Sequence, residues 1–107
     1  MDATKPIFEL MDLPDLAEDI GKNIKLARAA KGWRQEDLSQ ASGASLQAIK
    51  NLEAGGNVEL ITFLRATKAL GMGRAVWDVC KPTPQTLDEH ERVERARVES
   101  ARVRRKR

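Results

Sequence analysis

The sequence predicts a small all-α domain, and three observations support this fold class. The chain has 107 residues, enough for one domain with a tail left over. Hydrophobic residues make up 41% of the chain and charged residues 33%, which is typical of a folded helical domain rather than of a disordered chain. No stretch alternates cleanly between apolar and polar residues, so strands are not expected.

Glycines and capping residues mark the ends of five predicted helices. Gly32, Gly43 and Gly71 each follow an apolar stripe, where glycine commonly ends a helix. Ser45 is a natural N-cap for the third helix, and Asn57 can cap the fourth. The predicted helices span about residues 16–31, 35–42, 45–53, 57–70 and 73–79.

Two of these helices carry specific packing expectations. Gly21 in the first helix allows the close approach of another element, because glycine has no side chain. The fourth helix is rich in apolar residues, and we expect six of its residues to be largely buried, namely Leu60, Ile61, Phe63, Leu64, Thr67 and Leu70.

The composition divides the chain into three parts. Residues 1–15 form an N-terminal extension that holds Pro6 and Pro14 and several apolar residues. Residues 16–81 form the folded domain. Residues 82–107 form a basic, highly charged tail, whose valines recur every five residues and so fit no helical stripe. Glutamate and arginine are good helix formers, so this tail can form a helix, but we expect it to be solvated or partly disordered, and a partner could order it.

The charge distribution suggests a polyanionic partner. The formal net charge is +3. Acidic groups outnumber basic ones by six to one in residues 1–20, but basic groups outnumber acidic ones by ten to five in residues 21–81 and by eight to five in residues 82–107. A basic middle and a basic end favour a partner such as nucleic acid. A solvated surface with a basic tail is the alternative explanation.

No feature of the sequence indicates catalysis, a metal or a cofactor. Cys80 is the single cysteine and His90 the single histidine, so neither an intramolecular disulfide nor a zinc site from these residues can form. No glycine-rich phosphate loop is present, and His90 has no partner nucleophile. The sequence shows no signal peptide and no apolar run of membrane-spanning length, so we expect a cytoplasmic protein without a membrane role.

The segment 35–53 has the spacing of a helix-turn-helix. Two short helices flank a turn at Gly43, and small residues such as Ser39 let them meet at a steep angle. In this motif the first helix lies across the DNA backbone and the second enters the major groove.

The sequence resembles the Xre family of lambdoid phage repressor-like DNA-binding domains over about residues 18–79. The matching positions are Arg28, Gln35, Leu38, Gly43, Ser45, Ile49, Leu52, Glu53, Gly55, Leu64, Leu70 and Gly71. The resemblance implies a compact five-helix domain whose third helix reads double-stranded DNA.

The resemblance also implies roles for individual residues. Gln35 would bond a phosphate, and Gln47, near the tip of the reading helix, can pair with adenine. Leu46 departs from the polar residue often seen there and could contact a thymine methyl group or simply pack. The DNA-binding residues implied in this way are Arg34, Gln35, Ser45, Leu46, Gln47, Lys50 and Asn51.

Two further features follow from the resemblance. Arg28 and Glu53 match a salt-bridged pair that ties the first helix to the end of the third. The loop after the reading helix, AGGNVELI, lacks the basic residues that many family members carry. Phosphate contacts from this loop would have to come from the backbone amides of residues 55–57, and the basic tail could compensate.

We expect a homodimer that binds an operator, because one small domain makes few phosphate contacts. The expected dimer surface is Val76, Trp77 and Val79. The expected function is an autoregulatory repressor, which occludes the promoter of its own gene. The segment from Gly55 to Gly71 with the basic tail is also similar to HipB-like antitoxins, whose partner is a HipA-like kinase toxin. A protein-interaction module that does not read DNA is a further alternative.

Overall fold

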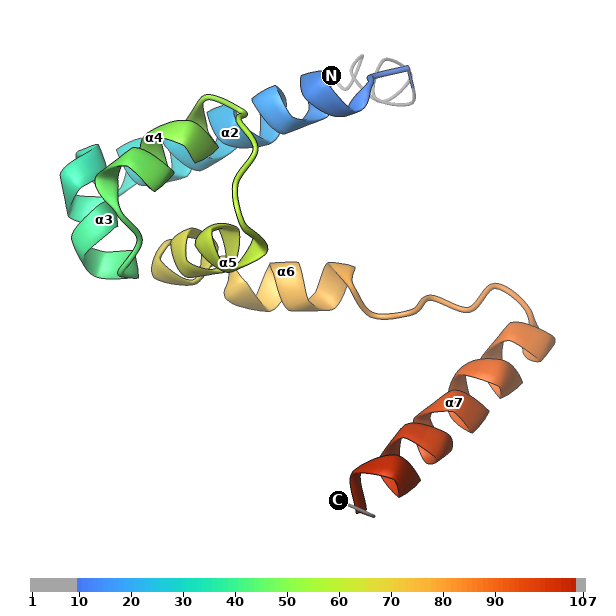
Figure 1. Cartoon of the computed structure of the whole chain (residues 1–107). Coiled ribbons are helices and arrows are strands. Elements are labelled where there is room, and N and C mark those ends of the chain that lie inside the picture. Colours follow the sequence, from blue (N-terminus) through green and yellow to red (C-terminus); the bar gives the residue numbers. More distant parts are fainter. Residues whose placement is uncertain (1–9, 106–107) are drawn as a thin grey trace. The chain divides into compact units, whose positions relative to one another are not determined.

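The computed structural model describes residues 10–105, and in this range all regular secondary structure is helical (Figure 1). Contacts between residues divide the chain into two compact units, Met1–Val76 and Trp77–Arg107. The helices are α2 (Leu13–Ala30), α3 (Gln35–Ser42), α4 (Leu46–Glu53), α5 (Leu60–Ala69), α6 (Gly73–Val79) and α7 (Leu87–Arg105). The predicted all-α class is confirmed.

Helix α2 begins three residues before its predicted start. The Asp12 side chain accepts a hydrogen bond of 2.9 Å from the backbone N–H of Asp15 and caps the helix. Pro14 lies in the first turn, where the backbone N–H that proline lacks would have no partner within the helix. The proline therefore belongs to the helix and does not precede it.

The turn between α3 and α4 is fixed by local hydrogen bonds. Gly43 adopts a φ of 80°, in the left-handed region that favours glycine. The Ser39 hydroxyl donates to the carbonyl of Ala44 at 2.6 Å. The Ser45 side chain accepts from the backbone N–H of Ala48 at 3.1 Å and caps α4. The start of α4 is therefore tied to the end of α3.

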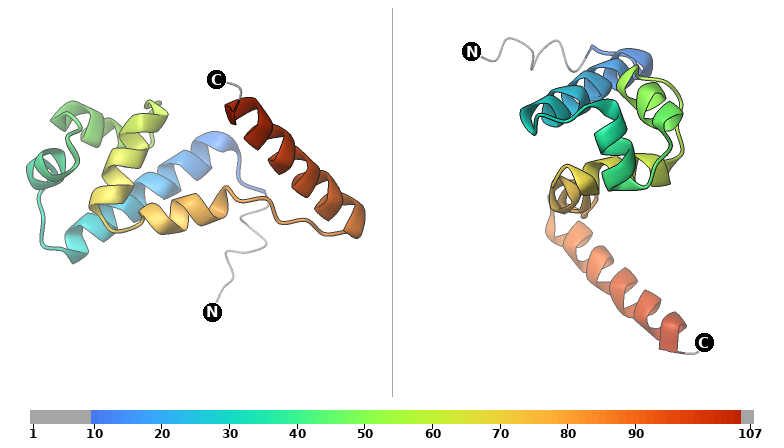
Figure 2. Two further views of the ribbon diagram at one scale, coloured as in Figure 1. Left: turned by 90° about the horizontal axis from the view of Figure 1, so that it is seen from below. Right: turned by 90° about the vertical axis from the view of Figure 1, so that its left-hand side faces the viewer.

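Helices α2 to α5 surround one small core (Figure 2). Helix α3 packs on α4 and α5, and α4 also packs on α2 and α5. Ile24, Leu38 and Ile49 have almost no exposed surface. The buried apolar cluster comprises Ile24, Leu38, Ala44, Ile49, Leu52, Ala66 and Leu70.

Helix α5 buries less of its apolar surface than predicted. It begins at Leu60 after Glu59, so Asn57 does not cap it. Leu60 and Ile61 are 70% and 51% exposed, and Leu64 is also exposed, so the expectation that these three residues are buried was wrong. The expectation holds for Thr67 and Leu70, which are buried, and Phe63 is half-buried against the core. Together with Ala66, these residues form the inward face of α5 at a spacing of three and four residues.

The second unit contains α7, and this corrects the expectation of a disordered tail over the residues that the structure describes. The Thr86 hydroxyl accepts from the backbone N–H of Glu89, and the Glu89 carboxylate accepts from that of Thr86, both at 3.1 Å. This reciprocal arrangement is a capping box. Glutamate and arginine, which dominate the following turns, are good helix formers.

Candidate nucleic-acid interface

Helix α4 presents a polar face to solvent. Gln47, Lys50 and Asn51 are exposed, whereas Ile49 and Leu52 are buried. Positions three and four apart lie on the same side of a helix, so the three polar residues form one surface. We call Gln47, Lys50 and Asn51 the polar face of α4.

Hydrogen bonding organises this polar face. The Gln47 Nε2 donates to the Asn51 Oδ1 at 3.0 Å. Gln47 keeps its side-chain oxygen and a second N–H, and Asn51 keeps its amide N–H groups, so both can still bond another partner. At the tip of the helix, Ser45 is exposed and Leu46 is half-buried. The polar face thus offers donors and acceptors together.

An arginine from α5 supports the turn that precedes the polar face. The Arg65 Nη1 donates to the carbonyl of Gly43 at 3.1 Å. Together with the Ser39 bond to Ala44, it holds the turn from two sides. Sequence reasoning did not identify Arg65, because an exposed arginine 22 positions from its partner gives no periodic or spacing signal.

The structure brings Arg28 and Glu53 together in a two-point ion pair. The Arg28 Nε lies 2.7 Å from Glu53 Oε2, and Arg28 Nη2 donates to Glu53 Oε1 at 3.0 Å. Arg28 Nη1 also donates to the carbonyl of Trp33 at 2.8 Å. The pair therefore links α2, the turn that follows α2, and the end of α4.

The surroundings of Glu53 favour its charged form. Burial raises the pKa of the Glu53 carboxyl. Hydrogen bonds from Arg28 and Gln35 and the charge of Arg28 lower it by more than burial raises it, so the net shift is downward. The hydrogen bond that Arg28 donates to Glu53 is also the main reason that the pKa of Arg28 is raised. Both groups stay ionised, although Glu53 is only 8% exposed.

Gln35 and Arg34 lie at the start of α3. The Gln35 Nε2 donates to Glu53 Oε1 at 3.0 Å, and the residue is half-buried. One amide hydrogen is thus used inside the domain, and a phosphate contact by Gln35 would need the other amide hydrogen or the backbone N–H. Arg34 is exposed, with its Nε 3.8 Å from an oxygen of Asp37.

The backbone amides expected to contact phosphate in the loop after α4 are partly used inside the chain. Gly55 N–H donates to the carbonyl of Leu52 at 3.1 Å, and Gly56 N–H donates to that of Asn51 at 2.8 Å. These bonds satisfy carbonyls at the end of α4, as is usual after a helix. To contact a phosphate, the amides of Gly55 and Gly56 would have to give up or share these bonds.

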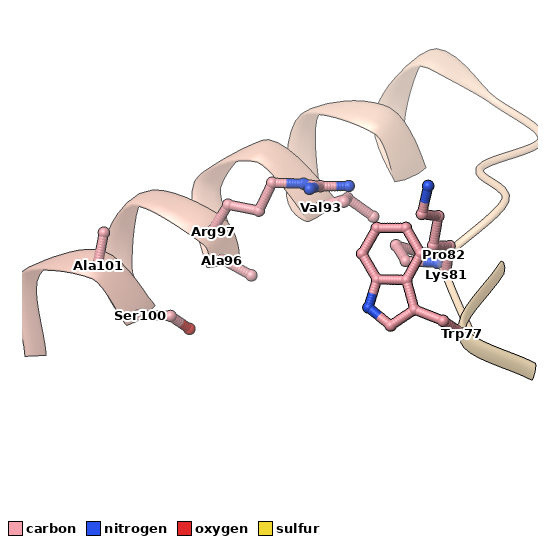
Figure 3. Close-up of a pocket in the computed structure, with 8 residues that line it drawn as sticks. All are labelled: Trp77, Lys81, Pro82, Val93, Ala96, Arg97, Ser100 and Ala101. Carbon is pink, nitrogen blue, oxygen red and sulfur yellow. The ribbon is translucent and has the colours of Figure 1, made fainter. Parts of the chain in front are cut away.

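The residues expected to form a dimer surface lie on α6. Val76 is half-buried, and Trp77 and Val79 are 59% and 79% exposed. Within the second unit, Trp77 faces α7 and has Lys81 Nζ 4.0 Å from its ring centre (Figure 3). A hollow of about 990 Å³ is lined here by Trp77, Lys81, Pro82, Val93, Ala96, Arg97, Ser100 and Ala101.

Residues 10–105 contain neither a membrane-spanning helix nor a metal-binding cluster. No helix in this range is both long enough and apolar enough to cross a membrane. Within the same range, no three His, Cys, Asp or Glu side chains are grouped so that they could hold a metal ion. Cys80 and His90 are both exposed.

Comparison with known proteins identifies the family. The family model described as helix-turn-helix matches residues 24–77, which is half of the chain. A search of curated proteins and a search of solved structures gave no match. The matched region contains the whole α3–turn–α4 segment and the core around it. The chain therefore belongs to the Xre-like helix-turn-helix family of lambda repressor-like DNA-binding domains.

Proposed function

We propose that the protein is a sequence-specific repressor that reads double-stranded DNA with α4. The observation that carries this proposal is the polar face of α4, with Gln47, Lys50 and Asn51 exposed together on a helix whose start is fixed by three bonds. A fixed reading helix is needed because base readout depends on placing donors and acceptors against the base edges.

The chemistry of the polar face suggests which contacts it makes. Glutamine and asparagine amides pair bidentately with the N6 and N7 atoms of adenine in the major groove. Gln47 and Asn51 share a hydrogen bond of 3.0 Å, so one side chain can orient the other while it contacts a base. Lys50 on the same face can donate to a guanine edge or to a phosphate.

Repression follows from dimeric binding at a promoter. A C2 dimer would place two α4 helices in successive major grooves, with half-sites about one helical turn apart. Occupation of such a site would exclude the transcription machinery. An antitoxin role with a HipA-like kinase as partner is the alternative implied by the resemblance, and co-purification with such a kinase would support it.

The substitution Gln47→Ala tests the proposed reading role. We expect it to weaken operator binding by roughly 1–3 kcal/mol and to leave binding to random duplex nearly unchanged, because it removes only the hydrogen bonds to a base edge. Fluorescence anisotropy on the labelled DNA upstream of the gene, with excess random duplex as competitor, measures both affinities.

Gln40→Ala is the matched control, since Gln40 is an exposed glutamine on α3 outside the polar face. It should change neither affinity. An equal loss on operator and random DNA for Gln47→Ala would remove Gln47 from base reading. A wild-type protein that does not prefer the upstream DNA over random duplex would refute the proposed function.

A further inference from the structure

The two units of the chain differ in net charge. The unit Met1–Val76 contains ten basic and ten acidic residues, so its formal charge is zero. The unit Trp77–Arg107 contains nine basic and six acidic residues and carries the whole excess of +3. The unit that contains α4 thus carries no net formal charge.

Several groups that could bind phosphate in the first unit are already engaged. Arg28 is neutralised by Glu53 at 2.7 Å, and Arg65 donates to the Gly43 carbonyl. The amides of Gly55 and Gly56 donate to carbonyls at the end of α4. Contacts to phosphates supply most of the sequence-independent affinity for DNA. Fewer groups of this unit are therefore free for phosphate, and a second source of positive charge would add to the sequence-independent affinity.

The excess positive charge is concentrated at one end of α7. Residues 77–101 hold four basic and six acidic side chains, whereas residues 102–107 hold five basic and no acidic ones. Helix α7 starts with Asp88 and Glu89 in its first turn and ends at Arg105. We call Arg102, Arg104 and Arg105 the basic end of α7.

The helix is suited to carry this charge to a partner. Its 19 residues span roughly 28 Å. Apart from the half-buried Glu89 and Val93, its residues are exposed through position 103, so most of the helix surface is accessible. Arginine binds phosphate through a planar set of N–H donors and stays charged at any physiological pH.

We propose that the basic end of α7 binds the phosphate backbone of double-stranded DNA without reading its sequence. This inference rests on the proposed function, because it assigns the DNA-binding role of the chain to two separate parts. The polar face of α4 supplies specificity, and the basic end of α7 supplies sequence-independent affinity.

A purely structural explanation makes a different prediction. Basic residues near the C-terminus of a helix interact favourably with its dipole, so the three arginines would stabilise α7 without touching DNA. In that case their removal would change helix content and leave the salt dependence of DNA binding unaltered.

The test compares two triple variants of the full chain. The first replaces the basic end, Arg102→Gln, Arg104→Gln and Arg105→Gln. The matched control replaces arginines of the acidic half of the same helix, Arg92→Gln, Arg95→Gln and Arg97→Gln. Both variants have three positive charges fewer than the wild type, and glutamine is nearly as good a helix former as arginine. Circular dichroism checks that the helix content of each variant is kept.

The probe is a labelled duplex of random sequence, and its affinity is measured by anisotropy between about 50 and 200 mM salt. The slope of log K against log salt should become shallower by about 0.9 for each phosphate that the variant no longer neutralises, or roughly 2 to 3 for the first variant. The control variant should keep nearly the wild-type slope. Affinities of the first variant for operator and random DNA should fall by the same factor.

Two results would overturn the inference. A wild-type slope in the first variant would show that the basic end does not contact phosphate. Equal changes of slope in both variants would show an effect of net charge alone. Because the probe has a random sequence, the result does not depend on an operator. A failure of operator preference in the wild type would refute the proposed function and leave this test in force.

Discussion

At the scale of single residues, Glu53 is the side chain that accepts hydrogen bonds from two other helices. It accepts from Arg28 on α2 and from Gln35 on α3, and it lies at the end of α4 itself. A nearly buried carboxylate with these partners is satisfied only while all three helices stay in place. Glu53 therefore joins the reading helix to the rest of its unit.

Removal of this carboxylate should destabilise the protein strongly. We expect Glu53→Ala to lower the free energy of unfolding by about 3–5 kcal/mol, because it leaves the charge of Arg28 without its partner. Urea unfolding followed by circular dichroism measures the change. Asp19→Ala, at an exposed acidic position on α2, is the control and should change stability by no more than about 0.5 kcal/mol.

Acid titration gives the same prediction a second readout. The folded-state pKa of Glu53 lies below its unfolded value, so its stabilising contribution is present above about pH 4.3 and is lost as the pH falls through the folded pKa. This part of the acid destabilisation should be absent in Glu53→Gln. The shift of Asp15 is in the opposite direction, because a side-chain hydrogen bond with Asp12 and the negative charge of Asp12 raise the pKa of the Asp15 carboxyl. An acid profile equal to the wild type in Glu53→Gln would contradict the assignment.

At the scale of elements, the close approach of α2 to α4 depends on Gly21. A Cβ atom at this position would lie 2.6 Å from the carbonyl oxygens of both Leu52 and Glu53. Backbone atoms in a packed helix cannot move away as a flexible side chain can. The two helices must therefore separate if residue 21 carries a side chain.

The substitution Gly21→Ala should thus destabilise the protein although alanine is the better helix former. We expect a net destabilisation of about 1–3 kcal/mol from overpacking, measured by thermal or urea unfolding. Gly73→Ala is the matched control, since its Cβ would lie 3.7 Å from the nearest atom, at an ordinary contact distance. A Gly21→Ala protein as stable as the wild type would refute the close contact.

Helices with a local end signal could be predicted well from the sequence. Helices α3 and α6 have the predicted bounds, and α4 follows the predicted cap Ser45. The signals are short-range, because a glycine or a serine cap acts on the turn next to it. The start of α5 was missed because Asn57 does not cap it. The helix in the tail was not expected because its valine spacing fits no helical stripe, whereas the local signal that starts it is the Thr86–Glu89 capping box.

Contacts between distant residues were harder to predict. The resemblance indicated the Arg28–Glu53 pair, but no spacing indicated that Gln35 and Arg65 also bond partners 18 and 22 positions away. The exposed Leu60 and Ile61 show a related limit. Apolar residues lie on several sides of α5, so hydrophobicity alone could not identify the face that packs on α3 and α4. In the structure, the buried residues of that face are spaced three and four apart.

At the scale of the whole molecule, the proposed sequence-reading face and the excess positive charge lie in different units. The neutral unit contains the polar face of α4, and the other unit carries the excess of positive charge. Such a division lets specificity and overall affinity vary separately, because phosphate contacts position a protein and base contacts specify the sequence. Both proposals can consequently be tested by substitutions that do not overlap.

The proposed dimer is also a property of the whole molecule. Val79 at the end of α6 is 79% exposed, and Trp77 beside it is 59% exposed. Neighbouring exposed apolar side chains of this kind can form part of a protein–protein interface. If it lies in the interface, Val79→Glu should bury two like charges near the twofold axis, since each copy contributes one. We expect at least a tenfold rise in the dimer dissociation constant, measured by sedimentation equilibrium.

The control for this prediction is Leu26→Glu, which adds the same charge at a 66% exposed leucine on α2. It should leave the dimer intact. Operator binding gives an independent readout. A dimer binds both half-sites of a palindrome at once and gains affinity, whereas a monomer binds each half-site independently. The Val79→Glu protein should therefore bind a single half-site as the wild type does and a full palindrome much more weakly. Equal behaviour of the two variants would place the interface elsewhere than on α6.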